Sequence, residues 1–405
     1  MGGEIAMKER FAQLDALRGL AALTVLFSHI VLFLVPSSMG GVLYGALTKT
    51  YSPFQIFVNG HSAVILFFVL SGFVLSLPWL DGGKQQPYFG YLTKRFFRIY
   101  VPYLFSFFVA LACLELAPKP EFNSMLSDYF KERWTHHLSP GVILEHVVGI
   151  VNVHTEELNS AYWSLVHEMR ISIFFPFIVL LLRNVRWYYT VSIGLLMFGI
   201  SALNDIMGFQ ASNGFNTTYF HTFDYLSLFL YGMLLAKHRI GIVNRFRALS
   251  GRAKFAVLAG ALVCYNSSYA FIKALGELHV VLPFGQLLRD QIIAIGVVGF
   301  VVIALASRRV DKALLSPIPL FLGKISYSLY LYHMVIFITM IRFFVGYMPM
   351  PILLLLSFFV SVAVAYLAWT CIEKPMISLG RKLAGVFRKR TPDSLRGGNR
   401  PDIVA

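Results

Sequence analysis

Charged residues are scarce in this chain. Only 14% of its 405 residues are Asp, Glu, Lys or Arg, whereas soluble domains average about 25%. Hydrophobic residues make up 57%, and many stand in runs long enough to cross a bilayer. This composition excludes an ordinary soluble domain and predicts an all-α, polytopic membrane protein. The apolar run after residues 1–10 is too long for the core of a cleavable signal peptide and lacks a small-residue cleavage site.

Cysteine is scarce as well. Cys113, Cys264 and Cys371 lie in or at the end of apolar runs and show neither metal-ligand spacing nor a disulfide framework. We expect them to pack in the core or against lipid. One loop is rich in His and Glu but has no HExxH or CxxC spacing, so we predict a solvated, titratable outer surface and no metal there. Its residues are His136, His137, Glu145, His146, His154, Glu156 and Glu157.

Acidic residues are outnumbered by basic ones. The chain has 20 Asp and Glu against 35 Lys and Arg, which gives a net charge of +15. In a soluble protein such a charge would suggest nucleic acid as a partner. Here the basic residues gather in alternate segments between the apolar runs, as the positive-inside rule describes. We therefore predict no nucleic-acid partner and expect the basic side to face the cytoplasm.

Ten apolar runs are long enough to span a membrane. They cover residues 14–35, 57–79, 99–117, 162–182, 187–203, 222–236, 254–273, 286–306, 321–346 and 350–372. The basic segments then fall on the side of both termini, so we predict a cytoplasmic N-terminus and C-terminus. Residues 141–153 are apolar but too short to cross, which predicts a re-entrant or interfacial helix on the outer side.

The chain divides into three parts by these criteria. Residues 1–13 form a cytoplasmic N-terminus, residues 14–376 the transmembrane domain, and residues 377–405 a basic, partly disordered tail that we expect to contact anionic lipid. Pro375 is expected to end the tenth span, where Glu373 can pair with a cytoplasmic arginine. We see no internal repeat and no appended soluble domain.

The first span carries Arg18 and His29, which are eleven residues apart. Eleven residues make about three helical turns, so both side chains lie on one face, roughly 16 Å apart along the axis. Ionisable residues inside a span are expensive and by default indicate function. The geometry predicts one residue near the cytoplasmic surface and one well inside the bilayer, both facing the same cavity.

Further polar residues stand at other spans. Arg95 and Arg98 are three residues apart at the start of the third span and share a face, which suits phosphate binding or an anchor for lipid head groups. Glu168 enters the fourth span, where a carboxylate needs a partner such as a histidine or arginine; Arg170 points in a different direction on the helix. Trp163 before it is typical of an interface anchor.

The second and ninth spans contain two more polar groups. Ser71 and Gly72 stand among bulky aromatics, which is typical of a close helix–helix contact. Ser326, Tyr330 and His333 form one polar stripe in the ninth span, with His333 near the bilayer midplane. The sequence leaves open whether His333 is a hydrogen-bonded structural histidine or a functional one.

Six motifs occur in order along residues 11–376: residues 14–19 with Arg18 and His29, then 67–73, 95–102, 163–168, 325–333 and 373–375. Together they resemble the acyltransferase-3 family of integral membrane O-acyltransferases. The resemblance implies ten core spans in a bacterial cytoplasmic (inner) membrane. It also implies transfer of an acyl group, usually acetyl, from cytoplasmic acyl-coenzyme A to a hydroxyl of an envelope glycan or similar acceptor.

The sequence departs from this family in two places. It has Ile171 and Ser172 where the family often has Phe-Tyr. We also expect no C-terminal extracytoplasmic esterase-like domain of the kind that many relatives carry, so the membrane part or a partner would handle the acceptor.

For this reaction we predict His29 as the base, with Glu168 orienting it or binding the acceptor. Arg18 would hold the pantetheine or phosphate part of acetyl-coenzyme A, with no metal involved. The other predicted donor contacts are Arg95, Arg98, Ser71, Tyr330 and His333, and the predicted acceptor contacts are Trp163, Ser164 and Asp15. Direct transfer and a route through an acyl-histidine both remain open.

Two other functions compete with this one. A transporter or flippase of a lipid-linked glycan would use the same polar residues as a substrate path, but it predicts inverted repeats and broken helices, which the sequence does not show. A scaffolding subunit would leave Arg18, His29 and Glu168 without a role.

Overall fold

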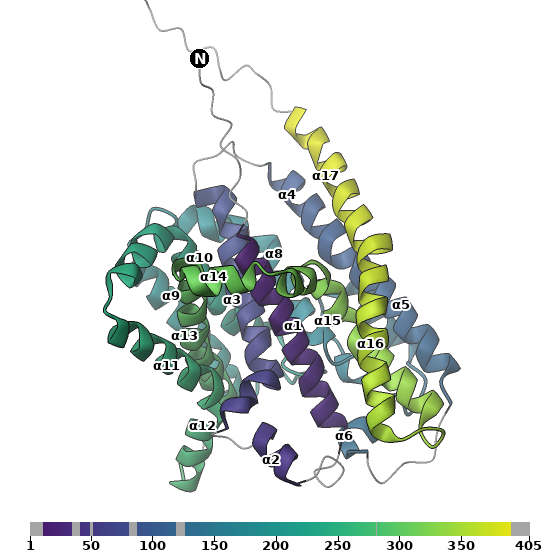
Figure 1. Cartoon of the computed structure of the whole chain (residues 1–405). Coiled ribbons are helices and arrows are strands. Elements are labelled where there is room, and N and C mark those ends of the chain that lie inside the picture. Colours follow the sequence, from purple (N-terminus) through teal and green to yellow (C-terminus); the bar gives the residue numbers. More distant parts are fainter. Residues whose placement is uncertain are drawn as a thin grey trace, which may run out of the picture.

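The structure, a computed structural model, describes residues 11–34, 41–48, 52–80, 87–118, 126–280 and 282–389 (Figure 1). These residues form helices and loops, with no strand among them, as the all-α prediction requires. The longer helices are α1 (Ala12–Phe33), α3 (Gly60–Leu80), α5 (Val101–Leu116), α8 (Tyr162–Leu182), α9 (Trp187–Met207), α10 (Tyr219–Ala248), α11 (Gly251–Asn266), α13 (Gly285–Ala306), α15 (Pro317–Phe344), α16 (Met350–Ala368) and α17 (Lys374–Lys389).

Shorter helices lie between or beside these. They are α2 (Gly41–Thr48), η2 (Pro53–Phe57), α4 (Tyr88–Arg95), η3 (Phe96–Tyr100), α6 (Asp128–Lys131), α7 (Pro140–Val148), η4 (Thr155–Glu157), α12 (Ser268–Glu277), α14 (Arg308–Leu314) and η5 (Trp369–Glu373). Of these, η3 and η5 are π-helical turns.

The ten predicted spans correspond to helices of the structure. Among the described residues, nine helices are long and apolar enough to cross a membrane, and α11 with α12 forms a tenth candidate bent by 62°. The prediction of ten spans is therefore confirmed if the bent pair counts as one span. The chain is a multi-pass membrane protein.

Two predicted boundaries were wrong. The third span does not begin at residue 99, because α4, η3 and α5 form one continuous span over Tyr88–Leu116. The tenth does not stop at Pro375, because η5 leads directly into α17. The five-residue hydrogen bond from Lys374 N–H to Trp369 O widens this turn just before the proline, and wide turns of this kind accommodate a proline inside a helix.

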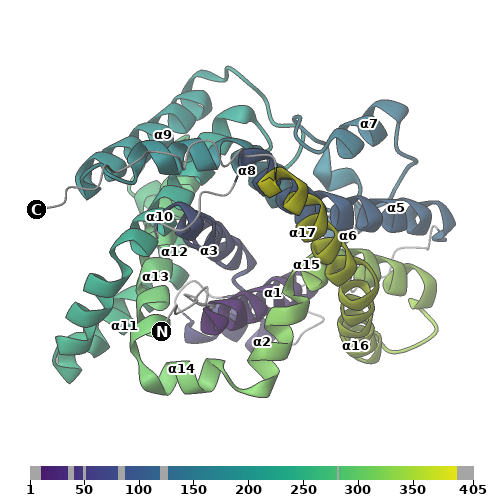
Figure 2. The same cartoon turned by 90° about the horizontal axis from the view of Figure 1, so that it is seen from above.

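The centre of the bundle is α1, which packs along α15 and α3, while α3 packs along α10 (Figure 2). Two glycines make these close approaches possible. A Cβ on Gly19 would lie 2.3 Å from the backbone nitrogen of Gly323 in α15, and one on Gly72 would lie 2.1 Å from the carbonyl oxygen of Phe229 in α10. The close helix contact predicted at Ser71–Gly72 is thus confirmed for Gly72, and small residues allow helix backbones to approach closely in membranes.

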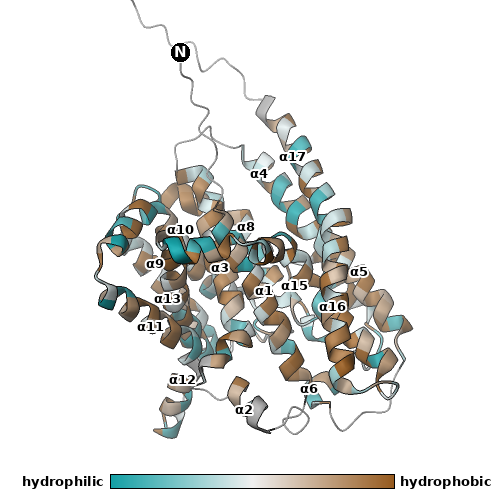
Figure 3. Ribbon diagram, viewed as in Figure 1, coloured by the Kyte–Doolittle hydropathy of each residue, from teal (hydrophilic) through white to brown (hydrophobic). Residues whose placement is uncertain are grey.

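The two ends of the bundle differ in polarity. The helices α4 and α17 project at one end with many hydrophilic residues, and α2, α6 and α12 lie at the opposite end (Figure 3). Arg381 and Lys382 of α17 are exposed, whereas Ala384 is buried against Gly90 of α4. The predicted basic tail therefore begins as an amphipathic helix docked on α4; residues 390–405 lie outside the described part.

The short apolar segment predicted at residues 141–153 contains α7. Its nine residues are too few to cross a bilayer, in agreement with the prediction. Ser139 caps the helix by accepting a hydrogen bond from Val142 N–H at 3.3 Å. Its position on the outer side stays a prediction.

Candidate active site

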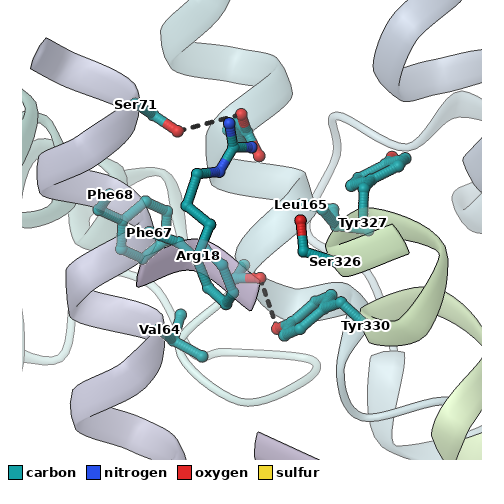
Figure 4. Close-up of a pocket in the computed structure, with 11 residues that line it drawn as sticks. Arg18, Val64, Phe67, Phe68, Ser71, Leu165, Ser326, Tyr327 and Tyr330 are labelled. Carbon is teal, nitrogen blue, oxygen red and sulfur yellow. Dashed lines mark hydrogen bonds between the residues drawn. The ribbon is translucent and has the colours of Figure 1, made fainter. Parts of the chain in front are cut away.

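A cavity of about 30 Å³ lies between α1, α3, α8 and α15 (Figure 4). This volume holds about two water molecules. Its lining contains five of the predicted site residues, Arg18, Ser71, Ser164, Glu168 and Tyr330, and also Ser326 of the polar stripe. Apolar side chains complete the wall, among them Val64, Phe67 and Phe68. The tertiary structure thus brings together residues that the sequence places on four different spans.

Arg18 enters this cavity from α1. Figure 4 shows its side chain extending along the cavity towards Ser71. Its Nε is buried and has no hydrogen-bond partner among the described residues. A buried donor without a partner costs free energy, so this guanidinium is suited to a ligand that supplies an acceptor.

Glu168 is held by α4 and α3. Arg95 Nη2 donates to Glu168 Oε1 at 2.8 Å, and Ser71 Oγ donates to the same oxygen at 3.3 Å. Arg95 also donates to Ser172 Oγ from Nη2 at 2.9 Å. Glu168 therefore contacts an arginine, one of the two partners expected for it. Among the described residues it forms no hydrogen bond or ion pair with His29, so the geometry does not support an orienting role.

Arg95 lies in a different environment from the one predicted. Its side chain is only 11% exposed and turns inward to Glu168, so it is not an anchor for lipid head groups. Arg98, one turn further on, is exposed and lies within electrostatic range of Arg18 and of Glu373 in η5. Arg18 and Arg98 are not within ion-pair distance of a carboxylate in the described part of the chain. They are therefore the cations of this cluster most available to an anionic ligand.

Glu373 faces inward from η5. It is 7% exposed and accepts a hydrogen bond from Ser328 Oγ of α15 at 2.7 Å. The predicted ion pair with an arginine is replaced by this neutral donor, although Arg98 and Arg18 remain electrostatic neighbours. Both π-helical turns thus carry a charged residue of the cluster, and π-turns occur frequently at functional sites.

His29 and His333 meet deeper in the bundle. His333 Nε2 lies 3.2 Å from His29 Nδ1, and the ring centroids are 5.0 Å apart. His333 is completely buried, whereas His29 is partly exposed. Tyr330, one turn before His333, donates to the carbonyl of Ala161 at 2.9 Å. Its hydroxyl also accepts from Ser164 at 2.7 Å, which links the cavity to the histidine pair.

Two predicted acceptor contacts do not line the cavity. Asp15 lies one turn before Arg18, where its carbonyl oxygen would be 2.6 Å from a Cβ on Gly323. Trp163 packs in the core with a 7% exposed side chain and stacks on His61, with centroids 6.1 Å apart. Of the three predicted acceptor contacts, only Ser164 reaches the cavity.

Sequence reasoning missed His61 and Asp290. His61 Nε2 lies 2.5 Å from Asp290 Oδ1, and the two residues are 229 positions apart in the sequence. Asp290 is an ionisable residue inside the eighth predicted span, and such a residue indicates function by default, as it did for Glu168. The sequence therefore contained a signal for Asp290. Its partner could not be read from the sequence, because no local spacing connects α3 to α13.

Arg170 also proves to be structural. Its guanidinium donates to the carbonyls of Ile150 at 2.8 Å, Thr218 at 2.9 Å and Val151 at 2.5 Å. It therefore ties α8 to the loops beside α7 and α10. It does not neutralise Glu168.

The histidine-rich loop is less solvated than predicted. His136 and His137 are largely exposed, as expected, with 67% and 71% of their side chains accessible. His146 is fully buried, and burial lowers the pKa of its imidazole. No cluster of three or more potential metal ligands occurs among the described residues.

The fold and site together define a multi-pass membrane protein with an arginine–carboxylate cluster and a histidine pair enclosed by its helices. The acyltransferase domain family matches residues 11–370, so the chain belongs to this family. It is an acyltransferase of the membrane. No curated protein and no solved structure matches it.

Proposed function

We propose that this protein transfers an acyl group, taken here as acetyl, from cytoplasmic acyl-coenzyme A to a hydroxyl group of an envelope glycan. The observation that carries the proposal is the pairing of His29 with His333 beside a cavity that contains Arg18, whose Nε has no hydrogen-bond partner among the described residues. A histidine supplies a base or a nucleophile, and the arginines supply charge for the donor.

The hydrogen bonds around His29 assign its tautomer. Its Nδ1 lies 2.9 Å from the carbonyl of Val25, and a carbonyl can only accept, so Nδ1 carries the proton. His333 Nδ1 likewise donates to the carbonyl of Leu329 at 3.0 Å, which leaves His333 Nε2 as an acceptor towards His29. The second nitrogen of His29, Nε2, then has a lone pair. Among the described residues it has no hydrogen-bond partner.

This lone pair permits either of two routes. In direct transfer, Nε2 takes the proton of the acceptor hydroxyl, the oxygen attacks the thioester carbonyl, and the thiolate of coenzyme A leaves and takes up that proton. In the two-step route, Nε2 itself attacks the carbonyl, the thiolate leaves, and the acceptor oxygen later displaces the imidazole. Both routes give an ester and free coenzyme A.

An arginine of the cavity and a second one outside its lining suit a phosphate-bearing donor. Coenzyme A carries the acyl group as a reactive thioester and has anionic phosphates. Arg18, with its unpartnered Nε, and the accessible Arg98 are suited to those phosphates or to the pantetheine amides. Arg95 is already paired with Glu168, so we assign it to positioning that carboxylate within the donor site.

The proposed reaction also requires a defined orientation of the protein in the membrane. The positive-inside rule places both termini and the arginine cluster on the cytoplasmic side, where acyl-coenzyme A is found. We further propose a bacterial inner membrane, with anionic lipid beside the exposed Arg381 and Lys382 of α17. The glycan would then approach from the opposite side, where α6 lies (Figure 3).

The test uses membranes from cells that express this chain, supplied with radiolabelled acetyl-coenzyme A and an envelope glycan fraction. The wild type should transfer label to the glycan as an alkali-labile ester. His29→Gln should reduce transfer at least about 100-fold, because a base or nucleophile contributes factors of this size. Normal membrane levels of the variant must be verified.

His146→Gln is the matched control. His146 of α7 also bonds through Nδ1 to a carbonyl four residues earlier, at 2.8 Å, but it does not line the cavity. Transfer by this variant should stay at the wild-type level. Full activity of His29→Gln would show that the role given to His29 is wrong, and a wild type that neither labels glycan nor binds coenzyme A would favour a transporter.

A further inference from the structure

His61 and Asp290 form a buried imidazole–carboxylate pair to which the proposed reaction has given no role. His61 begins α3, and Asp290 lies in the first part of α13. The carboxylate is completely buried, and the His61 side chain is 18% exposed. Asp290 Oδ1 accepts from Nε2 of His61, and Arg289 Nε lies 4.0 Å from the same oxygen. The other oxygen, Oδ2, has no hydrogen-bond partner among the described residues.

The hydrogen bonding of His61 differs from that of three buried histidines in the bundle. Three others use both ring nitrogens in hydrogen bonds: His167 with Thr222 and Asn216, His221 with Thr218 and Asp205, and His333 with Leu329 and His29. Among the described residues, His61 uses Nε2 only. A carboxylate on Nε2 makes that nitrogen the proton carrier, so Nδ1 has the lone pair.

The surroundings of His61 hold its ring in place. Trp163 stacks nearly parallel to it, with 15° between the planes, and Phe215 meets it edge-on with centroids 6.0 Å apart. A carboxylate and two aromatic rings thus fix the orientation of the imidazole. This is the arrangement in which a histidine serves as a general base, because the carboxylate stabilises the imidazolium that forms.

His61 also lies beside the proposed site. A Cβ on Gly60 would be 2.1 Å from Ser28 Oγ, so the start of α3 touches α1 at the residue next to His29. Trp163, the stacking partner of His61, precedes Ser164, whose hydroxyl bonds to Tyr330 at 2.7 Å. Tyr330 in turn contacts His333, with ring centroids 6.0 Å apart. His61 and His29 each have one ring nitrogen without a hydrogen-bond partner among the described residues. These contacts connect the two histidines within one network of packed side chains.

We propose that His61, positioned by Asp290, is the base for the acceptor hydroxyl, and that His29 receives the acyl group first. This inference rests on the proposed function and selects the two-step route. His29 Nε2 attacks the thioester carbonyl, the C–S bond breaks, and the coenzyme A thiolate leaves.

In the second step the acceptor oxygen attacks the acyl carbon and its proton passes to Nδ1 of His61. The C–N bond to His29 breaks, which restores a neutral His29. The imidazolium of His61 then returns its proton to solvent or to the thiolate. The overall products are one ester and one free thiol.

Other charged groups face this region and keep their own partners. Asp224 of α10 is an electrostatic neighbour of Asp290, and its Oδ1 accepts from Gln291 Nε2 at 2.7 Å. His221 pairs with Asp205 of α9 at 3.1 Å. The second pair is chemically similar to His61–Asp290, but both nitrogens of its ring are engaged, so it is a matched control.

The experiment measures two reactions in the same membranes. The first is exchange of label between coenzyme A and acetyl-coenzyme A without acceptor, which needs only acyl transfer to the protein. The second is labelling of the glycan. His61→Gln should lower glycan labelling at least about 100-fold while exchange stays close to the wild-type rate. His29→Gln should abolish both reactions.

Asp290 is tested as a positioning residue. Asp290→Asn should lower glycan labelling at least about tenfold without changing exchange, and Asp290→Glu should recover part of the loss because it restores the carboxylate. If His61→Gln does not fold, this pair of variants decides the question alone. The control His221→Gln should leave the ratio of labelling to exchange unchanged.

Each remaining outcome would overturn the inference. Normal labelling by His61→Gln, or an equal loss of both reactions, would remove His61 from the acceptor step. Wild-type labelling without exchange would establish direct transfer. A wild type that exchanges label but esterifies no glycan would contradict the proposed acceptor, and a wild type without either reaction would contradict the proposed function itself.

Discussion

Ser172 shows how a small residue determines the position of a charged one. Its hydroxyl accepts hydrogen bonds from both Nη2 and Nε of Arg95, at 2.9 and 3.2 Å. Arg95 then reaches Glu168 at 2.8 Å. Ser172 is also one of the two positions where the sequence departs from the pattern common in the family. The departure therefore falls on a residue that supports the charged cluster.

Replacing Ser172 by Ala should weaken this support without unfolding the protein. The variant loses the hydrogen bonds from the charged Arg95 to the Ser172 hydroxyl. Hydrogen bonds of this kind contribute about 1.5–3 kcal/mol, and water that enters the site replaces part of this stabilisation. We therefore expect the KM for acetyl-coenzyme A to rise about tenfold or less, with little change in kcat. The measurement is a donor titration of glycan labelling.

Ser201→Ala is the control for that experiment. Ser201 is fully buried in α9, and its hydroxyl has no hydrogen-bond partner among the described residues. Its removal should leave the KM unchanged and should not lower stability. An unchanged KM in Ser172→Ala as well would show that Arg95 does not need this serine.

Helix crossings determine how the elements fit together. The α1–α15 crossing depends on Gly19 and Gly323, because a Cβ at either position would lie within 2.6 Å of the other helix's backbone. A backbone cannot rotate away as a side chain can. The crossing also brings Arg18 and His29 of α1 to Tyr330 and His333 of α15, so stability and site geometry share these contacts.

Gly19→Val should therefore destabilise the protein by about 3 kcal/mol, at the upper end of the usual cost of overpacking. The expected result is a clearly lower Tm in detergent and loss of transfer activity. Gly260→Ala is the matched control, since a Cβ at Gly260 in α11 would meet nothing within 4 Å. It should leave the Tm unchanged or raise it, because Ala favours helix over Gly. A Tm of Gly19→Val equal to that of the wild type would contradict this close crossing of α1 and α15.

At the scale of the whole molecule, orientation in the membrane is a prediction from charge. It can be tested with single cysteines in a variant that lacks Cys113, Cys264 and Cys371. Tyr347, 86% exposed between α15 and α16, is predicted to face outward, and Leu383 of α17 to face the cytoplasm.

In intact cells a membrane-impermeant maleimide should label Tyr347→Cys, while Leu383→Cys should react only after the membrane is opened. The opposite pattern would place the arginine cluster on the outer side. Acyl-coenzyme A could not then reach it from the cytoplasm, and the proposed donor would be wrong.

The sequence by itself determined the elements that depend on local composition. Apolar run length predicted the ten spans, and the eleven-residue spacing predicted that Arg18 and His29 share one face of the first helix. The polar residues of four spans also indicated where the site would form, and the cavity contains Arg18, Ser71, Ser164, Glu168 and Tyr330. These features follow from helix periodicity and from the cost of polar groups in hydrocarbon.

Only the tertiary structure decided which of those residues are partners. His29 meets His333 across 304 positions, and His61 meets Asp290 across 229. Glu168 pairs with Arg95 although His29 was an equally reasonable partner from the sequence. Such pairs depend on which helix faces pack together, and that is determined by backbone contacts such as Gly19 against Gly323. Hydropathy gives the length of a span, but it does not encode the helix that the span will meet.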